Sequence, residues 1–521
     1  MTVDVGSRSN VLLINPGISE CSQNKRINRL INISFPTSLG VIAGYLSASG
    51  IENVRIMDEQ IIAFDDKSLR ETIHSLQEPR IIGFSVLTLN CGRAYELAAK
   101  VKMIDPEAIT VFGGIHPTVA TEEVLGRGNI DVVVRGEGEN TFKEMVHLIL
   151  RHKDFKNILG ISFRNSVNCV HNPNRPMIEN LDEIPPFPYH LFENNLHKYP
   201  NFAGIFGSRG CPYGCTFCSA RSISGRKYRY HSIDRVISEC STLVYKYKQT
   251  SIFLMDDNIA VNKKHFIGLC GAIIKKGLHK DAFFHGSMRG DDATEEVLQK
   301  AADANFKIIY YGLETGSERL MKVINKGEKV EEVVAATKRA ADKGMAVGTT
   351  IIFGLPSETR KDRRDAMRLV RSLPLSSVRF NTLVPYPGTS VFNALASEGK
   401  ILIKRDWENF GVQYMWESDD IPYVPDNNDR LELIFDTMWA NLSFYLSIKG
   451  IRLLLTQSVA GGNVIRLSAK WFLSSGEIIR IASVFLYLAA RFLNVTTRLF
   501  WSKLRKYFIN ETLHTSTMEN G

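Results

Sequence analysis

Three cysteines lie close together in the segment Cys211-Pro-Tyr-Gly-Cys215-Thr-Phe-Cys218. Their Cys-x3-Cys-x2-Cys spacing brings three soft thiolates into one tight loop. Three thiolates can bind three irons of a 4Fe-4S cubane cluster and leave the fourth iron without a protein ligand. Because a vacant iron can bind a substrate, the spacing predicts a catalytic 4Fe-4S cluster with Cys211, Cys215 and Cys218 as its metal ligands.

A zinc knuckle is the alternative interpretation of these cysteines. A structural zinc ion takes four closed ligands, so the loop would have to recruit His231 or a remote cysteine. The thiols could also be incidental. The spacing, and the position of Cys211 directly after a predicted strand, favour the iron-sulfur cluster. The remaining cysteines are scattered and predict neither metal binding nor a disulfide framework: Cys21, Cys91, Cys169, Cys240 and Cys270.

The elements that must position this loop form a repeated pattern. In residues 1–150, short apolar runs alternate with helical patterns, which predicts a parallel sheet covered on both faces. We expect a flavodoxin-like (Rossmann-like), doubly wound domain whose ligand lies beyond the carboxyl ends of the strands. The expected strands lie near 10–16, 54–58, 80–86, 108–114 and 131–135.

A second α/β region follows a linker. Residues 172–200 contain six prolines, which suit neither a helix interior nor a central strand, so 151–200 is predicted as a linker. Over 201–400 the alternation resumes six times. Six units fall short of the eight that close a TIM barrel, which predicts an open, partial (β/α)6 barrel. Its strands are expected near Gly204, Ile252, Phe283, Lys307, Ala346 and Val378.

Residues 401–521 are predicted to form a mainly helical C-terminal cap. The longest apolar run, Ile481–Ala490, is flanked by Arg480 and Arg491 and is shorter than the roughly 20 residues that cross a membrane. One interpretation is a helix in the membrane interface, with its cations facing anionic lipid headgroups. The other is a pair of helices that pack on the barrel.

Composition and charge limit the function classes. The chain has 521 residues, 44% of them hydrophobic and 23% charged, which is typical of a globular protein with several domains. The net charge of +9 resides in residues 445–508, where ten basic residues face one acidic residue; this concentration argues against nucleic acid as a partner. The N-terminal residues lack an apolar signal segment, so we expect a cytoplasmic protein that could lie peripherally on the inner face of the membrane.

Taken together, the motif and the two α/β regions resemble the radical S-adenosylmethionine (SAM) superfamily, in the branch with an N-terminal cobalamin-binding domain. This branch includes the anaerobic protoporphyrin ester cyclase and many carbon and phosphorus methylases. The resemblance covers roughly residues 10–410. It implies that the unique iron chelates the amino and carboxylate groups of SAM, and that one electron from the cluster yields a 5'-deoxyadenosyl radical. It also implies that Phe217 lies against the adenine.

The resemblance further implies a cofactor cradle at the carboxyl ends of the barrel strands. Arg289 could pair with the methionyl carboxylate, and Glu314 suits the ribose hydroxyls or the amine. Each residue also has a structural explanation, since paired acids cap helices and glycine with proline forms turns. The predicted cofactor-binding residues of the barrel are Asp256, Asp257, Asn258, Ser287, Arg289, Glu314, Gly354, Pro385 and Tyr386.

By the same resemblance, Ser85, Thr88, Gly113 and Gly114 line a pocket for the nucleotide tail of cobalamin. The Asp-x-His-x-x-Gly motif, whose histidine replaces the lower cobalt ligand in many methyltransferases, is absent from the sequence. Either cobalt is held without a histidine or the domain no longer binds cobalamin. His116, between Gly-Gly-Ile and a proline, is predicted to order its loop rather than to bind the metal.

These features predict a cobalamin-dependent radical SAM methyltransferase that acts on an unactivated carbon of a lipophilic or secondary metabolite. A radical cyclase or rearrangement enzyme is the alternative from the same branch. A non-catalytic, membrane-associated metal or redox module is the alternative from another class. The expected partners are a small-molecule substrate and an electron donor such as flavodoxin or ferredoxin.

Overall fold

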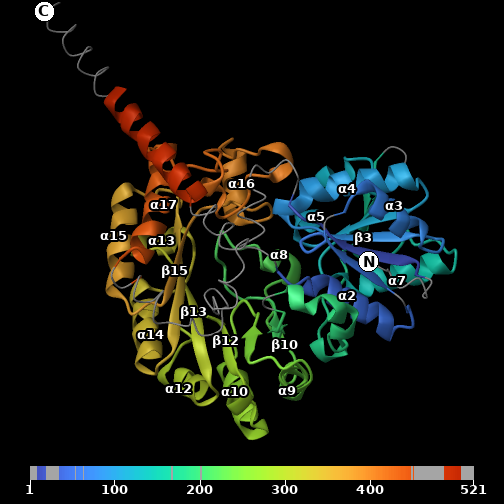
Figure 1. Cartoon of the computed structure of the whole chain (residues 1–521), viewed down its shortest axis with the longest axis horizontal. Coiled ribbons are helices and arrows are strands. Elements are labelled where there is room, and N and C mark those ends of the chain that lie inside the picture. Colours follow the sequence, from blue (N-terminus) through green and yellow to red (C-terminus); the bar gives the residue numbers. More distant parts are fainter. Residues whose placement is uncertain are drawn as a thin grey trace, which may run out of the picture.

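The computed structural model describes residues 9–18, 34–52, 54–62, 64–165, 168–199, 202–447, 450 and 486–505. Two α/β units are formed by separate, mainly parallel sheets (Figure 1). Cys21 and the apolar residues 481–485 lie outside the described part of the chain.

The first sheet has the strand order β2-β1-β3-β4-β5-β6-β7. Strands β1 to β5 are parallel and follow the flavodoxin-like order 2-1-3-4-5, which confirms the predicted fold. The antiparallel strands β6 and β7 extend the sheet beyond residue 150, into the segment that the sequence predicts as linker. The bounds are β1 Val11–Asn15, β2 Arg55–Asp58, β3 Ile81–Ser85, β4 Ile109–Gly113, β5 Val132–Val134, β6 Ile161–Arg164 and β7 Cys169–His171.

Helices cover both faces of this sheet, because successive strand residues point to opposite sides. Leu12 and Ile14 of β1 belong to the core under α3 and α4, whereas Val11 and Leu13 belong to the core under α2 and α7. Such two-sided burial explains the continuous apolar runs of these strands. The helices are α2 Thr37–Ala48, α3 Asp66–His74, α4 Cys91–Ile104, α5 Ile115–Val119, α6 Thr121–Leu125 and α7 Gly138–Leu150.

The proline-rich segment continues from β7 without an α-helix and forms the 3-10 helices η2 (Leu181–Glu183) and η3 (Tyr189–Lys198). It is nevertheless packed. Phe187, Phe192 and Tyr199 gather around Phe35, with ring centroids 4.8 to 5.5 Å from the Phe35 ring. The segment is thus a fixed connection between the two α/β units.

The second sheet has six parallel strands in the order β15-β14-β13-β12-β11-β8. No strand pair among the described residues joins β8 to β15, so the barrel is open, as the six-unit pattern predicts. All six predicted positions fall on or beside these strands. Their bounds are β8 Gly204–Ile205, β11 Ser251–Leu254, β12 Phe283–Met288, β13 Phe306–Glu314, β14 Ala346–Phe353 and β15 Ser377–Thr382.

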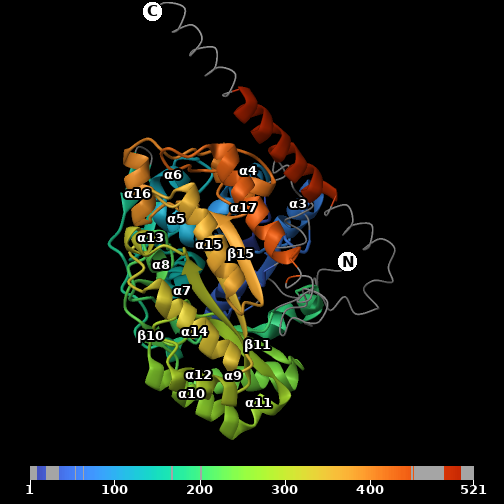
Figure 2. The same ribbon diagram turned by 90° about the vertical axis from the view of Figure 1, so that its left-hand side faces the viewer.

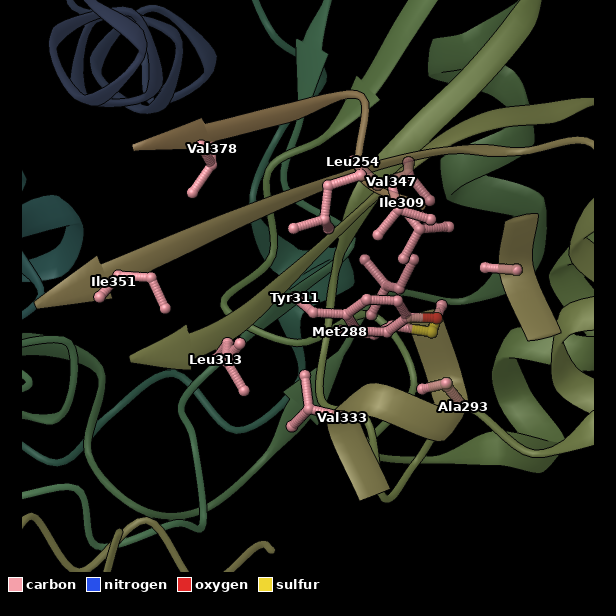
Figure 3. Close-up of a cluster of buried hydrophobic side chains, with 14 of the residues drawn as sticks. Leu254, Met288, Ala293, Ile309, Tyr311, Leu313, Val333, Val347, Ile351 and Val378 are labelled. Carbon is pink, nitrogen blue, oxygen red and sulfur yellow. The ribbon is translucent and has the colours of Figure 1, made fainter. Parts of the chain in front are cut away.

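The barrel helices pack against one side of this sheet. Ile309 and Val347 lie in the core between sheet and helices, and the end of the Tyr311 side chain lies beside the Met288 sulfur (Figure 3). The helices are α9 Ile233–Ser241, α10 Lys263–Lys276, α11 Leu278–Asp281, α12 Glu295–Asp303, α13 Glu318–Val323, α14 Val330–Asp342 and α15 Arg360–Ser372.

The C-terminal part is helical, as predicted. It comprises α16 (Ser390–Ser397), two short 3-10 helices (η5 Arg405–Trp407 and η6 Tyr414–Trp416), α17 (Arg430–Tyr445) and a helix over 486–505. Helix α17 packs on β15 and α15. In the last helix, Phe492 stacks on Phe435 of α17 at 5.6 Å.

The helix over 486–505 has two different faces. Val495 and Leu499 are buried, and Arg491 and Arg498 both pair with Asp419. The opposite face is solvent-exposed, and the helix extends away from the body of the protein (Figures 1 and 2). Packing on the cap therefore accounts for one face only. Among the described helices, none combines the length and the apolar character needed to cross a bilayer.

Candidate active site at the strand ends

The three predicted cluster ligands lie in a loop that a short ribbon closes. Strands β9 (Ser208–Arg209) and β10 (Arg229–Tyr230) pair antiparallel, and the loop between them carries the cysteines and α8 (Arg221–Ser224). Gly210 adopts φ +86°, and a Cβ there would lie 2.2 Å from the carbonyl oxygen of Lys227. Only glycine fits this position. The Cys211 amide then donates to the Gly225 carbonyl at 3.2 Å.

The three thiols are free and partly buried. Burial raises the pKa of each thiol, that of Cys218 to about 11. Around Cys215 the positive charges of Lys326 and Arg289 oppose this effect. A bound iron would supply the positive charge that thiolates need in such surroundings, so the donor set fits a cluster. Within the described residues, no three histidine, cysteine or acidic side chains converge on a single ion, whereas a cubane distributes its thiolates over separate irons.

Neighbouring elements hold the loop against the barrel. The Thr216 amide donates to the Ile324 carbonyl at 2.9 Å, and the Thr216 carbonyl accepts from the Val391 amide at 3.1 Å. The Asn325 side chain donates to the Gly214 carbonyl at 3.0 Å. The loop is therefore fixed from the ends of α13 and α16. Phe217 is half-buried and packs against the barrel core.

Arg289 supports the loop from the end of β12. Its guanidinium forms a bidentate pair with Asp291, at 2.9 and 2.8 Å, and donates to the Lys326 carbonyl at 2.7 Å. The guanidinium also lies 3.7 Å from the ring centroid of Tyr213, whose hydroxyl donates to Asp292 at 2.8 Å. Arg289 thus positions the loop residue Tyr213, and its predicted pairing with a methionyl carboxylate stays a prediction.

The acidic segment after β11 has three distinct environments. Asp256 is buried and accepts hydrogen bonds from the Gly207 amide at 3.1 Å and from the Ser208 hydroxyl. Asp257 is exposed. Burial is the main cause that raises the pKa of the Cys211 and Cys218 thiols, and the negative charge of Asp257 adds to this effect. Asp257 therefore lies towards the cysteine loop, with its carboxylate available to a ligand.

Asn258 completes this segment. It is buried and donates to Asp292 at 2.8 Å, while its own side-chain oxygen accepts from the Ala260 amide. In this structure Asp256 and Asn258 fix the loop backbone and Asp292, whereas Asp257 is the exposed residue of the three.

Glu314 belongs to a buried charge cluster at the end of β13. Its carboxylate pairs with Lys326 at 3.1 Å and accepts from Thr350 at 3.3 Å. Lys326 also lies 3.9 Å from Glu328. Although burial lowers the pKa of Lys326, the charges of Glu314 and Glu328 raise it above its ordinary value. Lys326 is therefore a charged ammonium beside Cys215.

Lys326 and Glu328 are site residues that the sequence pattern does not predict. Glu328 accepts from the Gly290 amide at 2.5 Å, and its other oxygen is buried without a hydrogen-bond partner among the described residues. The available signal was weak: a Lys-Gly-Glu triplet in a loop between two apolar segments. The residues approach Glu314 only because α13 turns back over the strand ends.

The remaining barrel candidates also lie at strand ends. Ser287 is half-buried near the end of β12, and its carbonyl accepts from Ile259 at 2.9 Å. Gly354 follows β14 with φ +85° and donates to Glu358 at 2.5 Å. Pro385 is buried after β15, and burial raises the pKa of the neighbouring Tyr386 to about 12.

The cobalamin-side candidates gather at the carboxyl ends of β3 and β4. The Ser85 hydroxyl lies 3.1 Å from that of Ser38, and Thr88 is buried in the 3-10 turn after β3. Gly113 ends β4. Gly114 has φ +103°, and a Cβ there would lie 2.8 Å from the Val86 carbonyl oxygen. This edge adjoins the point between β1 and β3 where the strand order reverses and ligands bind in doubly wound sheets.

His116 is fully buried at this edge. Its Nε2 lies 3.2 Å from both the Tyr95 hydroxyl and Glu123, and its ring packs edge-on against Trp407 at 5.4 Å. Trp407 also donates to Glu123 at 3.2 Å. These contacts order the loop and join it to the C-terminal cap, which agrees with the predicted loop-ordering role.

The two groups of candidate residues lie on neighbouring elements. Helix α5, which follows Gly114, contacts α8 of the cysteine loop (Figure 1). Gly388, in the loop after β15, lies so close to Val119 and Ser222 that a Cβ there would contact both. The loops at the carboxyl ends of the two sheets therefore pack against each other.

Comparison with known families matches both units. The family described as "Radical SAM superfamily" matches residues 205–370, and the one described as "B12 binding domain" matches residues 31–146. An uncharacterized methyltransferase of Pyrococcus horikoshii is 33% identical over 336 residues, which is 64% of this chain and 72% of the relative.

Two further relatives are more distant. The anaerobic magnesium-protoporphyrin IX monomethyl ester cyclase of Rubrivivax gelatinosus is 26% identical over 85% of this chain and 79% of its own length. The hopanoid C-3 methylase of Methylococcus capsulatus is 26% identical over 73% of this chain and 72% of its own length.

Solved structures share the fold. The cobalamin-dependent SAM radical enzyme OxsB superposes with a TM-score of 0.68 at 18% identity, over 92% of this chain and 72% of OxsB. The radical SAM methyltransferase TsrM from Kitasatospora setae, solved with cobalamin and a [4Fe-4S] cluster, gives 0.66 at 16% identity over 84% of this chain and 96% of TsrM.

Proposed function

Because the chain belongs to the radical SAM superfamily, in the branch with an N-terminal cobalamin-binding domain, we propose that it methylates an unactivated carbon of a lipophilic or secondary metabolite. Because this family consists of enzymes, the alternative of a non-catalytic metal or redox module loses its support. It also makes a 4Fe-4S cluster, SAM and cobalamin the cofactors. When bound, these groups supply a 5'-deoxyadenosyl radical and a transferable methyl group.

The protein's own residues bind and orient these groups. In the proposal, Cys211, Cys215 and Cys218 hold the irons, and Asp256 and Arg289 fix the loop that carries them. Glu314 and Asp257 offer carboxylates at the strand ends to the amine or ribose of SAM. The buried Lys326 keeps a positive charge beside Cys215, which favours its thiolate.

The observation that carries this proposal is the contact between the cysteine loop and the cobalamin-side edge. Helix α8 of the loop touches α5, directly after Gly114. Radical generation and methyl donation require two cofactors near one substrate carbon, since the reacting atoms must meet in a near-attack arrangement. The contact between the loops at the two strand-end edges supports that requirement.

Cys215→Ala tests the cluster site. In anaerobically reconstituted protein we expect the variant to lose the iron-sulfur absorbance and all 5'-deoxyadenosine formation, because a cubane with two protein ligands is not retained. Cys169→Ala, at a thiol on β7, is the matched control and should retain both. A variant with a fully formed cluster and full SAM cleavage would overturn the assignment.

Product analysis distinguishes methylation from cyclisation. A methyltransferase forms both S-adenosylhomocysteine and 5'-deoxyadenosine and adds one methyl group. The cyclase alternative, represented by the relative from Rubrivivax gelatinosus, adds none. Lipid extracts from cells that express the wild type or Cys215→Ala, compared by mass spectrometry, provide the substrate search, with flavodoxin or ferredoxin as the proposed electron donor.

The lipophilic substrate is supported by two observations. The names of two relatives refer to a hopanoid and a protoporphyrin, which are large apolar ring systems. In this chain, the last described helix exposes an apolar face formed by Leu486, Leu493, Phe500 and Trp501. We propose that this face contacts a membrane surface from which the substrate is drawn.

A further inference from the structure

Two arginines stand opposite each other in the ribbon that closes the cysteine loop. Arg209 and Arg229 are cross-strand partners in the β9–β10 pair, and both guanidinium groups are largely buried. Like charges directly opposite destabilise an antiparallel pair, and an isolated two-stranded ribbon has at best marginal stability. The ribbon therefore needs neutralising charge from another element.

That charge comes from the N-terminal α/β unit. Glu137 and Glu139 belong to the segment Arg135-Gly-Glu-Gly-Glu139, in which Glu137 is the N-cap of α7 and Glu139 lies in the first turn of that helix. Glu137 accepts two hydrogen bonds from Arg229, at 2.8 and 3.0 Å, and lies 3.3 Å from Arg209. Glu139 accepts from Arg209 at 2.6 Å. Two buried carboxylates thus balance two buried guanidinium groups.

The charge state of this cluster is fixed by its contacts. Burial alone would raise the pKa of Glu137, but the hydrogen bond from Arg229 and the charge of Arg209 lower it below its ordinary value. Glu137 is therefore an anion at neutral pH. Removing one partner of a buried ion pair leaves an uncompensated charge and is strongly destabilising.

We propose that Glu137 and Glu139 are positioning residues that hold the cysteine loop closed, so that retention of the cluster in the barrel depends on docking of the cobalamin-side unit. Arg209 stands two residues before Cys211, and Arg229 closes the other end of the loop. An opened ribbon would displace Cys211 from Cys215 and Cys218. The inference rests on the proposed role of these cysteines as cluster ligands.

The combined variant Glu137→Gln/Glu139→Gln tests the proposal with two measurements. In reconstituted protein, a ferrous chelator should remove iron about tenfold faster than from the wild type, because the loop opens more often. In cofactor-free protein, trypsin should cleave after Arg226 or Lys227 about tenfold faster, for the same reason. Glu239→Gln is the matched control, because Glu239 pairs with Arg235 at 2.6 Å within α9, away from the loop.

A third substitution separates charge neutralisation from simple packing. Adding Arg209→Gln removes the repulsion with Arg229, so iron retention should return towards the wild-type rate. Failure of this rescue would overturn the charge explanation. Rates within twofold of the wild type for Glu137→Gln/Glu139→Gln in both measurements would overturn the whole inference.

Two further outcomes remain informative. If the combined variant does not fold, Glu139→Gln alone leaves the bidentate Glu137–Arg229 pair intact and is measured instead, with the same expected direction and the same overturning result. If the wild type holds no iron, the proposed cluster site fails, and the trypsin rates of cofactor-free protein still decide whether the acids close the loop.

Discussion

At the residue scale, the buried carboxyl groups around the cysteine loop differ in charge because their donors differ. Glu137 faces two guanidinium groups, which keep it ionised. Asp256 receives only an amide and a hydroxyl hydrogen bond, and burial raises its pKa to about 6. A carboxyl that is neutral in mildly acidic solution can donate as well as accept. The loop is therefore held both by the ionised Glu137 and by Asp256, whose charge depends on pH.

Asp256→Asn should remove a pH dependence of stability. The folded-state pKa of Asp256, about 6, lies above the unfolded value of 3.8, so its stabilising contribution is complete below about pH 4 and is lost as pH rises through about 6. The free energy of unfolding of the wild type should therefore fall relative to the variant by up to about 3 kcal/mol over this window. Urea unfolding of cofactor-free protein at several pH values measures it.

The exposed Asp234 supplies the control for that experiment, because Asp234→Asn makes the same chemical change at the surface, in α9. A constant difference between wild type and Asp256→Asn from pH 4 to 7 would show that Asp256 is ionised throughout and that the amide and hydroxyl contacts suffice to keep it so.

At the element scale, the turn from β4 into α5 shows how backbone geometry limits the choice of residue at the cobalamin-side edge. Gly114→Ala should weaken hydroxocobalamin binding roughly tenfold, since it adds left-handed strain and a contact at 2.8 Å with the Val86 carbonyl. Gly128→Ala, with φ +78° and open space around its Cβ, carries the strain without the contact. An absorbance titration in which both variants bind equally would contradict this role for Gly114.

The elements that the sequence predicts well are those with a repeating pattern. Most strands of both sheets have enough residues for apolar runs or alternation to identify them, whereas the two-residue β8 is located by its place in the strand-helix repeat. The two-residue strands β9 and β10 have no period, and β6 and β7 are short antiparallel additions beside prolines. Their pairing is determined by tertiary contacts, such as Glu137 with Arg229, which no local pattern encodes.

The site residues show the same difference between those with a local sequence pattern and those placed by tertiary contacts. The cysteines were recognised because their spacing is local, and Glu314 because it ends a long strand. Lys326 and Glu328 were missed, since they reach Glu314 only through the turn after α13. Arg289 was identified by position, but its partners Asp291 and Tyr213 could not be derived from the strand pattern.

At the scale of the whole molecule, the C-terminal helix packs one face on the cap, through apolar and charged contacts, and leaves a second apolar face uncovered. Asp419 forms ion pairs with Arg491 and Arg498, and Glu432 forms one with Lys503. These contacts orient the helix over 486–505 on the cap. Leu486, Leu493 and Phe500 recur every seven residues, which places them on one face of a helix, and each is at least 60% exposed. Burial of this face in a lipid interface would remove its apolar surface from water, which is energetically favourable.

Replacing Leu493, Phe500 and Trp501 together by glutamine should abolish flotation with vesicles that contain anionic phosphatidylglycerol, because the apolar face supplies the burial and nearby cations only assist. Iron content and SAM cleavage should stay at the wild-type level, since the three side chains lie on the exposed face. Met103→Gln, at an exposed apolar residue of α4, is the control and should float like the wild type. Binding should also weaken with added salt. A wild-type protein that does not float, or a triple variant that floats equally well, would exclude the membrane contact and leave the apolar face to another partner.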